Sequence, residues 1–163
     1  LSNTSAARLN QSLVNEQSLA IGAGAGYTMI TRGGLSLFEF YATPSEGIST
    51  NIVEEAIKKE IKKIAEHGVT QDELNRIKTS VIANEVYEKD SVFYQAMLIG
   101  QLETMGYPYT LMDQYIENIK KVTSDQIQEV AKKYFLDDRL TVVSLNPQPL
   151  DPNKKPQGRP HVH

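Results

Sequence analysis

The 163-residue sequence contains no cysteine and no tryptophan, and only three histidines. Without cysteine the chain can form neither a disulfide nor a thiolate zinc site, so its redox compartment stays undetermined. No window approaches the roughly 18 uninterrupted apolar residues of a membrane-spanning helix. Basic residues are also not in excess, because the formal net charge is −3. That balance argues against a nucleic-acid-binding surface, which needs a positively charged face.

A signal peptide is not visible either, because no basic segment followed by an apolar one opens the sequence. The chain begins at Leu1 instead of methionine, which fits both a mature N-terminus and a piece of a longer chain. Hydrophobic residues make up 40% of the sequence and charged residues 23%. At this length, the composition predicts a single globular domain that buries a core of its own.

Three alternating glycines stand out near the N-terminus, at Gly22, Gly24 and Gly26. A dinucleotide-binding loop would need a further glycine at position 27 or 29, and these positions are Tyr27 and Met29. The spacing instead predicts a β-strand whose glycines share one face. The other face then carries Ile21, Ala23, Ala25 and Tyr27. Because bare backbone lets another element approach closely, we expect helices or sheet of the same domain to pack on the glycine face.

The predicted elements are a helix, two strands, four helices and a third strand. Periodicity and turn residues place them at 4–17, 19–30, 35–43, 51–67, 70–105, 110–121, 124–135 and 139–147. The turn between the first two strands is expected at 31–34, and an irregularity in the long helix near 88–91. Asn3 or Thr4 is the expected N-cap of the first helix.

These elements predict an α+β fold in which an antiparallel sheet is packed on one side by helices. Three strands make an incomplete sheet, so further strands are expected from a segment outside this sequence or from a partner. The domain is predicted to span residues 1–146. From Pro147 onward the polar, proline-rich chain predicts an extended or disordered tail at 147–163.

Two helix starts share one pattern, VTQDEL at 69–74 and VTSDQI at 122–127. In each, a threonine and the residue three positions later are typical of a capping box, Thr70 with Glu73 and Thr123 with Gln126. We therefore expect one helix to begin directly after Thr70 and another directly after Thr123.

Few residues are candidates for catalysis. A zinc-binding helix needs two histidines one turn apart with a glutamate nearby, but His67 stands alone at a helix end, and His161 and His163 lie in the predicted tail. We expect His67 to be solvated or to interact with the helix dipole. Asp137 and Asp138 are typical of a polar turn, and an acid–base role for the pair stays open. The residues alone thus indicate a scaffold or a binding half, not a self-sufficient catalyst.

Four stretches, in a fixed order, together resemble one known family. They are RLNQSLVNEQSLAIGAGAGY (8–27), FEFYATPSEG (38–47), VTQDELNRIKTSVIANEVYEKDSVFYQAMLIGQLETMGYP (69–108) and VTSDQIQEVAKKYFLDDRLTVVSLNPQPLD (122–151). The chain resembles the C-terminal half of bacterial zinc peptidases of the pitrilysin/insulinase superfamily, the group akin to mitochondrial processing peptidase.

This resemblance implies one half of a clamshell built from two related α+β halves. The N-terminal half of such a peptidase carries a His-x-x-Glu-His motif, in which the histidines bind Zn²⁺ and the glutamate is the general base. The C-terminal half binds no metal and closes over an extended peptide that pairs with a sheet edge of the other half. Since this sequence has no His-x-x-Glu-His, it would be the second half, without its first strands and without a cofactor of its own.

Many relatives carry an arginine in this half and a tyrosine seven residues later, in a pattern like Leu-Arg-x-x-x-Gly-Leu-Ala-Tyr. The arginine helps to hold substrate, and the tyrosine helps to stabilise the transition-state oxyanion. Aligned on LVNEQSLAI, these positions are Val14 and Ile21. The resemblance implies that both residues face substrate, but their aliphatic side chains donate no hydrogen bond.

Two interpretations of the parent protein stay open. In the first it is the zinc-bearing member of a subunit pair, and a second peptidase-like subunit supplies the absent donors. In the second it is a non-peptidase relative, similar to the structural core subunits of the respiratory cytochrome bc1 complex. The expected partners are an N-terminal catalytic lobe, a second subunit of the same kind and a peptide substrate. Bacterial relatives alone suggest the periplasm as its compartment.

Overall fold

A computed structural model of the protein describes residues 7–28 and 36–146. Within these ranges the chain forms a two-stranded antiparallel sheet, one π-helix, five α-helices and one 3₁₀ turn. In chain order the elements are η1 (Asn10–Glu16), β1 (Ala20–Tyr27), β2 (Phe38–Pro44), α1 (Thr50–His67), α2 (Gln71–Lys89), α3 (Val92–Thr104), α4 (Leu111–Lys121), α5 (Ser124–Tyr134) and η2 (Asp137–Arg139). The predicted α+β class is confirmed.

Some sequence-based predictions fall outside these ranges. They are the tail at 147–163, the turn at 31–34 and the N-cap candidates Asn3 and Thr4. The helix predicted over 4–17 is confirmed in its described part, where the last turns form η1 as a π-helix.

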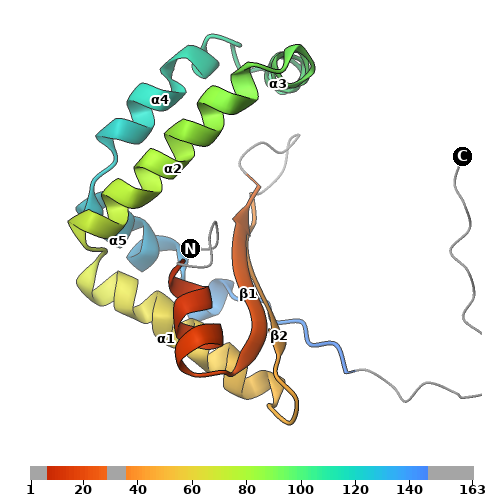
Figure 1. Cartoon of the computed structure of the whole chain (residues 1–163), viewed down its shortest axis with the longest axis vertical. Coiled ribbons are helices and arrows are strands. Elements are labelled where there is room, and N and C mark those ends of the chain that lie inside the picture. Colours follow the sequence, from red (N-terminus) through yellow and green to blue (C-terminus); the bar gives the residue numbers. More distant parts are fainter. Residues whose placement is uncertain (1–6, 29–35, 147–163) are drawn as a thin grey trace, which may run out of the picture.

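The hairpin of β1 and β2 carries the core of the fold on one face. Alanines of β1, aliphatic residues beside and within η1, and residues of α1 pack there into one buried cluster: Leu9, Leu13, Ala20, Ala23, Val53 and Ala56. Phe40 and Ala42 of β2 pack against the same cluster. In Figure 1, η1 and α1 accordingly lie on the same side of the two strands.

The packing against the glycine face of β1 differs from the prediction. A Cβ added at Gly22 or Gly26 would meet no atom of the described residues within 4 Å, whereas one at Gly24 would lie 2.5 Å from the ring of Tyr41. Helices therefore pack on the alanine face, and a cross-strand tyrosine lies over the middle glycine. A β-bulge between Ala20 and Gly22 also removes Ile21 from the alanine face.

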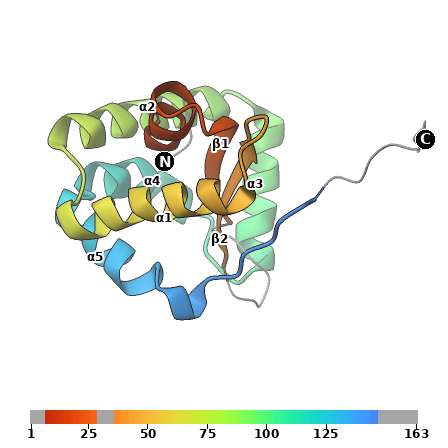
Figure 2. The ribbon, with the colours of Figure 1, turned by 90° about the horizontal axis from the view of Figure 1, so that it is seen from below.

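The α-helices form two groups, one packed near the sheet and one that extends away from it. Figure 2 shows α1 passing across the hairpin, with α5 packed beside α1. In Figure 1, α2 and α4 run side by side away from the sheet, and α3 lies at their far end. The break between α2 and α3 falls at Asp90 and Ser91, within the predicted irregularity, and the Ser91 hydroxyl caps α3 by accepting the Tyr94 amide at 3.2 Å.

The predicted third strand at 139–147 is wrong for the residues that the structure describes. The 3₁₀ turn η2 covers Asp137–Arg139, and residues 140–146 belong to no helix or strand. Phe135, just before η2, packs edge-on against Phe38 and Phe40 of β2. The chain after α5 is thus attached to the sheet by aromatic contacts, but within the described residues no strand pairs with it.

Candidate functional site

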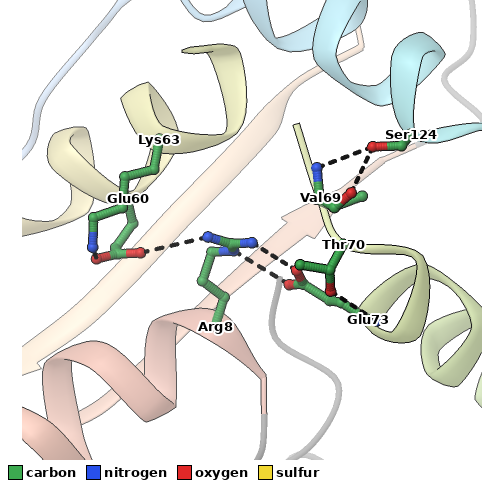
Figure 3. Close-up of polar contacts among 7 residues, drawn as sticks. All are labelled: Arg8, Glu60, Lys63, Val69, Thr70, Glu73 and Ser124. Carbon is green, nitrogen blue, oxygen red and sulfur yellow. Dashed lines mark hydrogen bonds and ion pairs between the residues drawn. The ribbon is translucent and has the colours of Figure 1, made fainter. Parts of the chain in front are cut away.

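A cluster of charged side chains joins the segment just before η1 to α1 and α2. The Arg8 guanidinium forms a two-pronged contact with the Glu73 carboxylate, from Nε to Oε1 at 3.2 Å and from Nη2 to Oε2 at 2.6 Å. Its Nη1 also lies 4.0 Å from Oε2 of Glu60. Figure 3 shows Arg8 between the two carboxylates. One arginine therefore holds acidic groups from two helices in place.

Glu60 is the buried member of this cluster, with only 3% of its surface exposed. It accepts hydrogen bonds from the Ser12 hydroxyl at 2.9 Å and from Lys63 Nζ at 2.6 Å. Burial acts to raise the pKa of Glu60, but the bonds from Lys63 and Ser12 and the charges of Lys63 and Arg8 outweigh it, so the pKa lies below its ordinary value. Glu60 is thus ionised at neutral pH and cannot serve there as a general acid.

The Arg8 contact also changes the predicted cap of α2. The Thr70 hydroxyl accepts the Glu73 amide, as a capping box requires, but the Glu73 carboxylate pairs with Arg8. Only half of the predicted box is therefore formed. At α5 the box is complete, because the Gln126 side chain accepts the Thr123 amide and the Thr123 hydroxyl accepts the Gln126 amide.

A second polar contact ties the start of α5 to the link between α1 and α2. The Ser124 hydroxyl donates to the Val69 carbonyl at 2.6 Å and accepts the Val69 amide at 3.1 Å. Figure 3 shows this pair beside the start of α2. Ser124, the residue directly after the predicted cap Thr123, thus positions the start of α5 against the link between α1 and α2.

The charged cluster lines a groove of about 540 Å³. Of the acidic residues on the lining of this groove, Glu60 and Glu73 are engaged by cations. Among the described residues of the lining, only Ser12 and Thr70 carry hydroxyl groups. Each hydroxyl already takes part in a hydrogen bond within the chain. Because these groups satisfy one another, the arrangement supports helix positioning and offers no activated nucleophile.

The histidine and carboxylate candidates that the structure describes do not form a metal site. His67 is exposed at the end of α1, with Nε2 3.8 Å from the Glu66 carboxylate. Asp137 and Asp138 lie in the exposed turn η2, and His161 and His163 lie outside the described residues. Over 7–28 and 36–146, no group of three or more histidine, cysteine or acidic residues could hold a metal ion.

The two family positions lie in different environments. Val14 is partly buried and packs against the core cluster, while Ile21 is 71% exposed at the β-bulge. The family pattern has a glycine four residues after the arginine position, and this chain has Ser18 there. Ser18 has φ of 52°, in the left-handed region that glycine adopts readily and other residues rarely do.

Sequence reasoning missed Arg8, Ser12, Glu60 and Lys63. One signal could have identified Glu60, since it lies four residues from both Ala56 and Ile64 on the apolar stripe of α1. A charged residue in a buried stripe needs a partner. Nothing local identifies that partner as Arg8, which is 52 residues away in the sequence.

Residues 1–81 match the family described as the Peptidase M16 inactive domain. No curated protein matches the chain. Within the described residues, no helix is long and apolar enough to cross a membrane.

Among solved structures, a protease from Helicobacter pylori matches with a TM-score of 0.79 and 22% identity, over 85% of this chain and 33% of that one. The inactive peptidase domain of a candidate zinc protease from Bordetella parapertussis matches with a TM-score of 0.75 and 17% identity, over 91% of this chain and 80% of that one. A candidate zinc protease from Bordetella pertussis Tohama I has a TM-score of 0.76, with the same identity and coverage.

The chain therefore spans about a third of the Helicobacter protease and most of the Bordetella domain. These identities establish a common fold. Together with the family match over residues 1–81, they confirm the resemblance read from the sequence. The chain belongs to the family of peptidase M16 inactive, or C-terminal, domains.

Proposed function

We propose that this chain is the non-catalytic C-terminal lobe of a zinc metalloendopeptidase and that it helps to enclose an extended peptide substrate. The observation that carries the proposal is the match of residues 1–81 to the M16 inactive domain. In this proposal a catalytic N-terminal lobe of the same protein holds Zn²⁺ through a His-x-x-Glu-His motif, and the two lobes close around the peptide.

The local chemistry supports a passive role for this lobe. The charged cluster around Arg8 is internally paired, and the family positions for substrate and oxyanion contacts are the aliphatic residues Val14 and Ile21. Neither side chain can stabilise a developing negative charge, since that requires hydrogen-bond donors aimed at the oxyanion. We therefore propose that a second peptidase-like subunit supplies these donors and pairs with this lobe.

A non-peptidase structural subunit of the same fold is the second candidate. The packing of Val14 against the core favours it, because a residue with a packing role needs no substrate contact. In that case the complete protein would carry no zinc motif, and its two lobes would serve assembly.

Metal analysis of the complete protein separates the two candidates. The peptidase proposal predicts about one zinc per complete chain and cleavage of a casein-like substrate, with the partner subunit present, that a chelator abolishes. A complete protein that holds no zinc and co-purifies with a stable, proteolytically inactive complex would support the structural subunit and overturn the peptidase.

A further inference from the structure

Two carboxylates are buried among the described residues, and one of them has no partner there. Glu60 and Glu85 are 3% and 7% exposed. Glu60 is held by a hydroxyl group and two cations, as described above, whereas Glu85 forms no hydrogen bond or ion pair with another described residue. Burying a charge is costly unless it is paired. Glu85 therefore indicates a cation that the described part of the chain does not supply.

The carboxylate of Glu85 lies near the junction of α2, α3 and α4. Burial raises the pKa of Tyr94 on α3 to about 12, and a hydrogen bond to Glu88 and the charge of Glu85 add to this effect. Burial and the same two charges also raise the pKa of Tyr115 on α4. Lys89 follows one turn later on α2, but it forms no ion pair with Glu85. The junction thus combines two carboxylates with no cation bound to the buried one.

This buried carboxylate can be reached from outside. Among the described residues, every side-chain oxygen that is wholly buried has a hydrogen-bond partner, so the unpaired oxygens of Glu85 must account for part of its remaining exposure. The nearby ends of α2 and α3 expose four large apolar side chains, which are Val86 (52%), Tyr87 (76%), Val92 (81%) and Phe93 (80%). Exposed apolar groups around a charge are typical of an interface, where the apolar rim shields an ion pair from water.

The chain outside the 163 residues is the best source of the covering surface. This chain covers 80% of the Bordetella parapertussis domain but 33% of the Helicobacter protease, so most of the outside chain belongs to other parts of the protein than this lobe. The junction also lies at the end of α2 and α4 that is farther from the sheet (Figure 1), whereas further strands of this lobe would extend the sheet. A second copy is a poorer partner, because it brings a second Glu85 without a cation.

We propose that the junction of α2, α3 and α4 docks onto the catalytic N-terminal lobe of the same protein, and that a lysine or arginine of that lobe pairs with Glu85. The four exposed apolar side chains would surround this ion pair. The proposal rests on the two-lobe protein proposed above, but not on zinc binding or proteolysis.

The substitution Glu85→Gln tests this pairing, because it keeps the shape of the side chain and removes its charge. In the complete protein we expect the melting temperature to fall by roughly 3 °C or more, since a buried ion pair is broken. In the 163-residue chain we expect an unchanged or higher melting temperature, since the charge has no partner there. Lys89→Gln is the matched control and should change the melting temperature of the complete protein by at most about 1 °C.

Hydrogen exchange measured by mass spectrometry locates the contact in the complete protein. Relative to wild type, Glu85→Gln should speed the exchange of amides at the junction and in one segment of the catalytic lobe. Should the shorter chain not fold, the melting temperature and the exchange of the complete protein decide alone.

Three results overturn the proposal. The first is an unchanged melting temperature of the complete protein with Glu85→Gln. The second is an equal loss in the shorter chain or with Lys89→Gln, which places the partner of Glu85 within the 163 residues. The third is faster exchange confined to this lobe, or a loss that depends on protein concentration and so identifies a second copy. A complete protein without zinc would overturn the peptidase role and leave this docking intact, so the two failures are distinguishable.

Discussion

Replacing Glu60 by glutamine tests whether the buried charge cluster holds the helices together. The substitution keeps the shape of the side chain and can still accept the Ser12 bond, but it removes the charge that Lys63 and Arg8 face at 2.6 and 4.0 Å. Breaking a buried ion pair costs about 3–5 kcal/mol. Because the Lys63 side chain is 47% exposed and the Ser12 bond survives, we expect the free energy of unfolding to fall by about 2 kcal/mol.

The matched control is Glu66→Gln on the same helix. Glu66 is half exposed and lies 3.7 Å from the exposed Lys62, so its loss should change the free energy of unfolding by at most about 0.5 kcal/mol. Urea unfolding of the purified chain, followed by far-ultraviolet circular dichroism, measures both variants. An effect of Glu60→Gln no larger than that of Glu66→Gln would refute the assigned role of the cluster.

The pH dependence of the unfolding free energy supplies an independent check on the role of the Glu60 charge. Its folded-state pKa lies below the ordinary value of about 4.5, so its stabilising contribution is complete above that pH and is lost as the pH falls through the folded pKa. Glutamine does not titrate. The difference in unfolding free energy between wild type and Glu60→Gln should therefore shrink as the pH falls from 7 to 3. A difference that stays constant over this range would contradict the charge-based explanation.

Two backbone predictions use the same urea assay. Ser18→Gly should raise the free energy of unfolding by about 0.5 kcal/mol, because glycine accepts the φ of 52° without strain. A decrease in the free energy of unfolding would show that Ser18 is not strained there. Gly24→Ala should be about 1 kcal/mol less stable than Gly26→Ala, because the new Cβ displaces the Tyr41 ring at Gly24 and meets open space at Gly26. Equal stabilities of the two glycine variants would contradict the packing described for Tyr41.

Local signals in the sequence predicted most of the helical structure. The caps at Thr70 and Thr123 lie at predicted helix starts, because a hydroxyl that accepts an early helix amide acts over three residues. Ser91 lies in the predicted irregularity and caps the separate helix α3. Gly68, the residue after the predicted helix over 51–67, ends α1 with a φ of 70°. The antiparallel pairing of β1 with β2 followed from the alternating glycines of the first strand and the aromatic and apolar residues of the second.

Contacts between residues far apart in the sequence could not be predicted from such local signals. The pairing of Arg8 with Glu73 joins residues 65 positions apart, and it changed a capping box that the local pattern predicted correctly only in part. The glycine face was predicted to be covered by helices or sheet, but the helices pack on the opposite face, which carries the small alanine side chains. The strand predicted at 139–147 has the right composition, yet pairing depends on a neighbour that the local sequence cannot specify.

Zinc content is the most direct test of the central claim that this lobe carries no catalytic centre of its own. The measurement compares bound zinc per chain, and chelator-sensitive cleavage of a casein-like substrate, in the 163-residue chain and in the complete protein. We predict no stoichiometric zinc and no such cleavage for the 163-residue chain, and about one zinc for the complete protein. One tightly bound zinc in the 163-residue chain, together with cleavage that a chelator abolishes, would contradict the account.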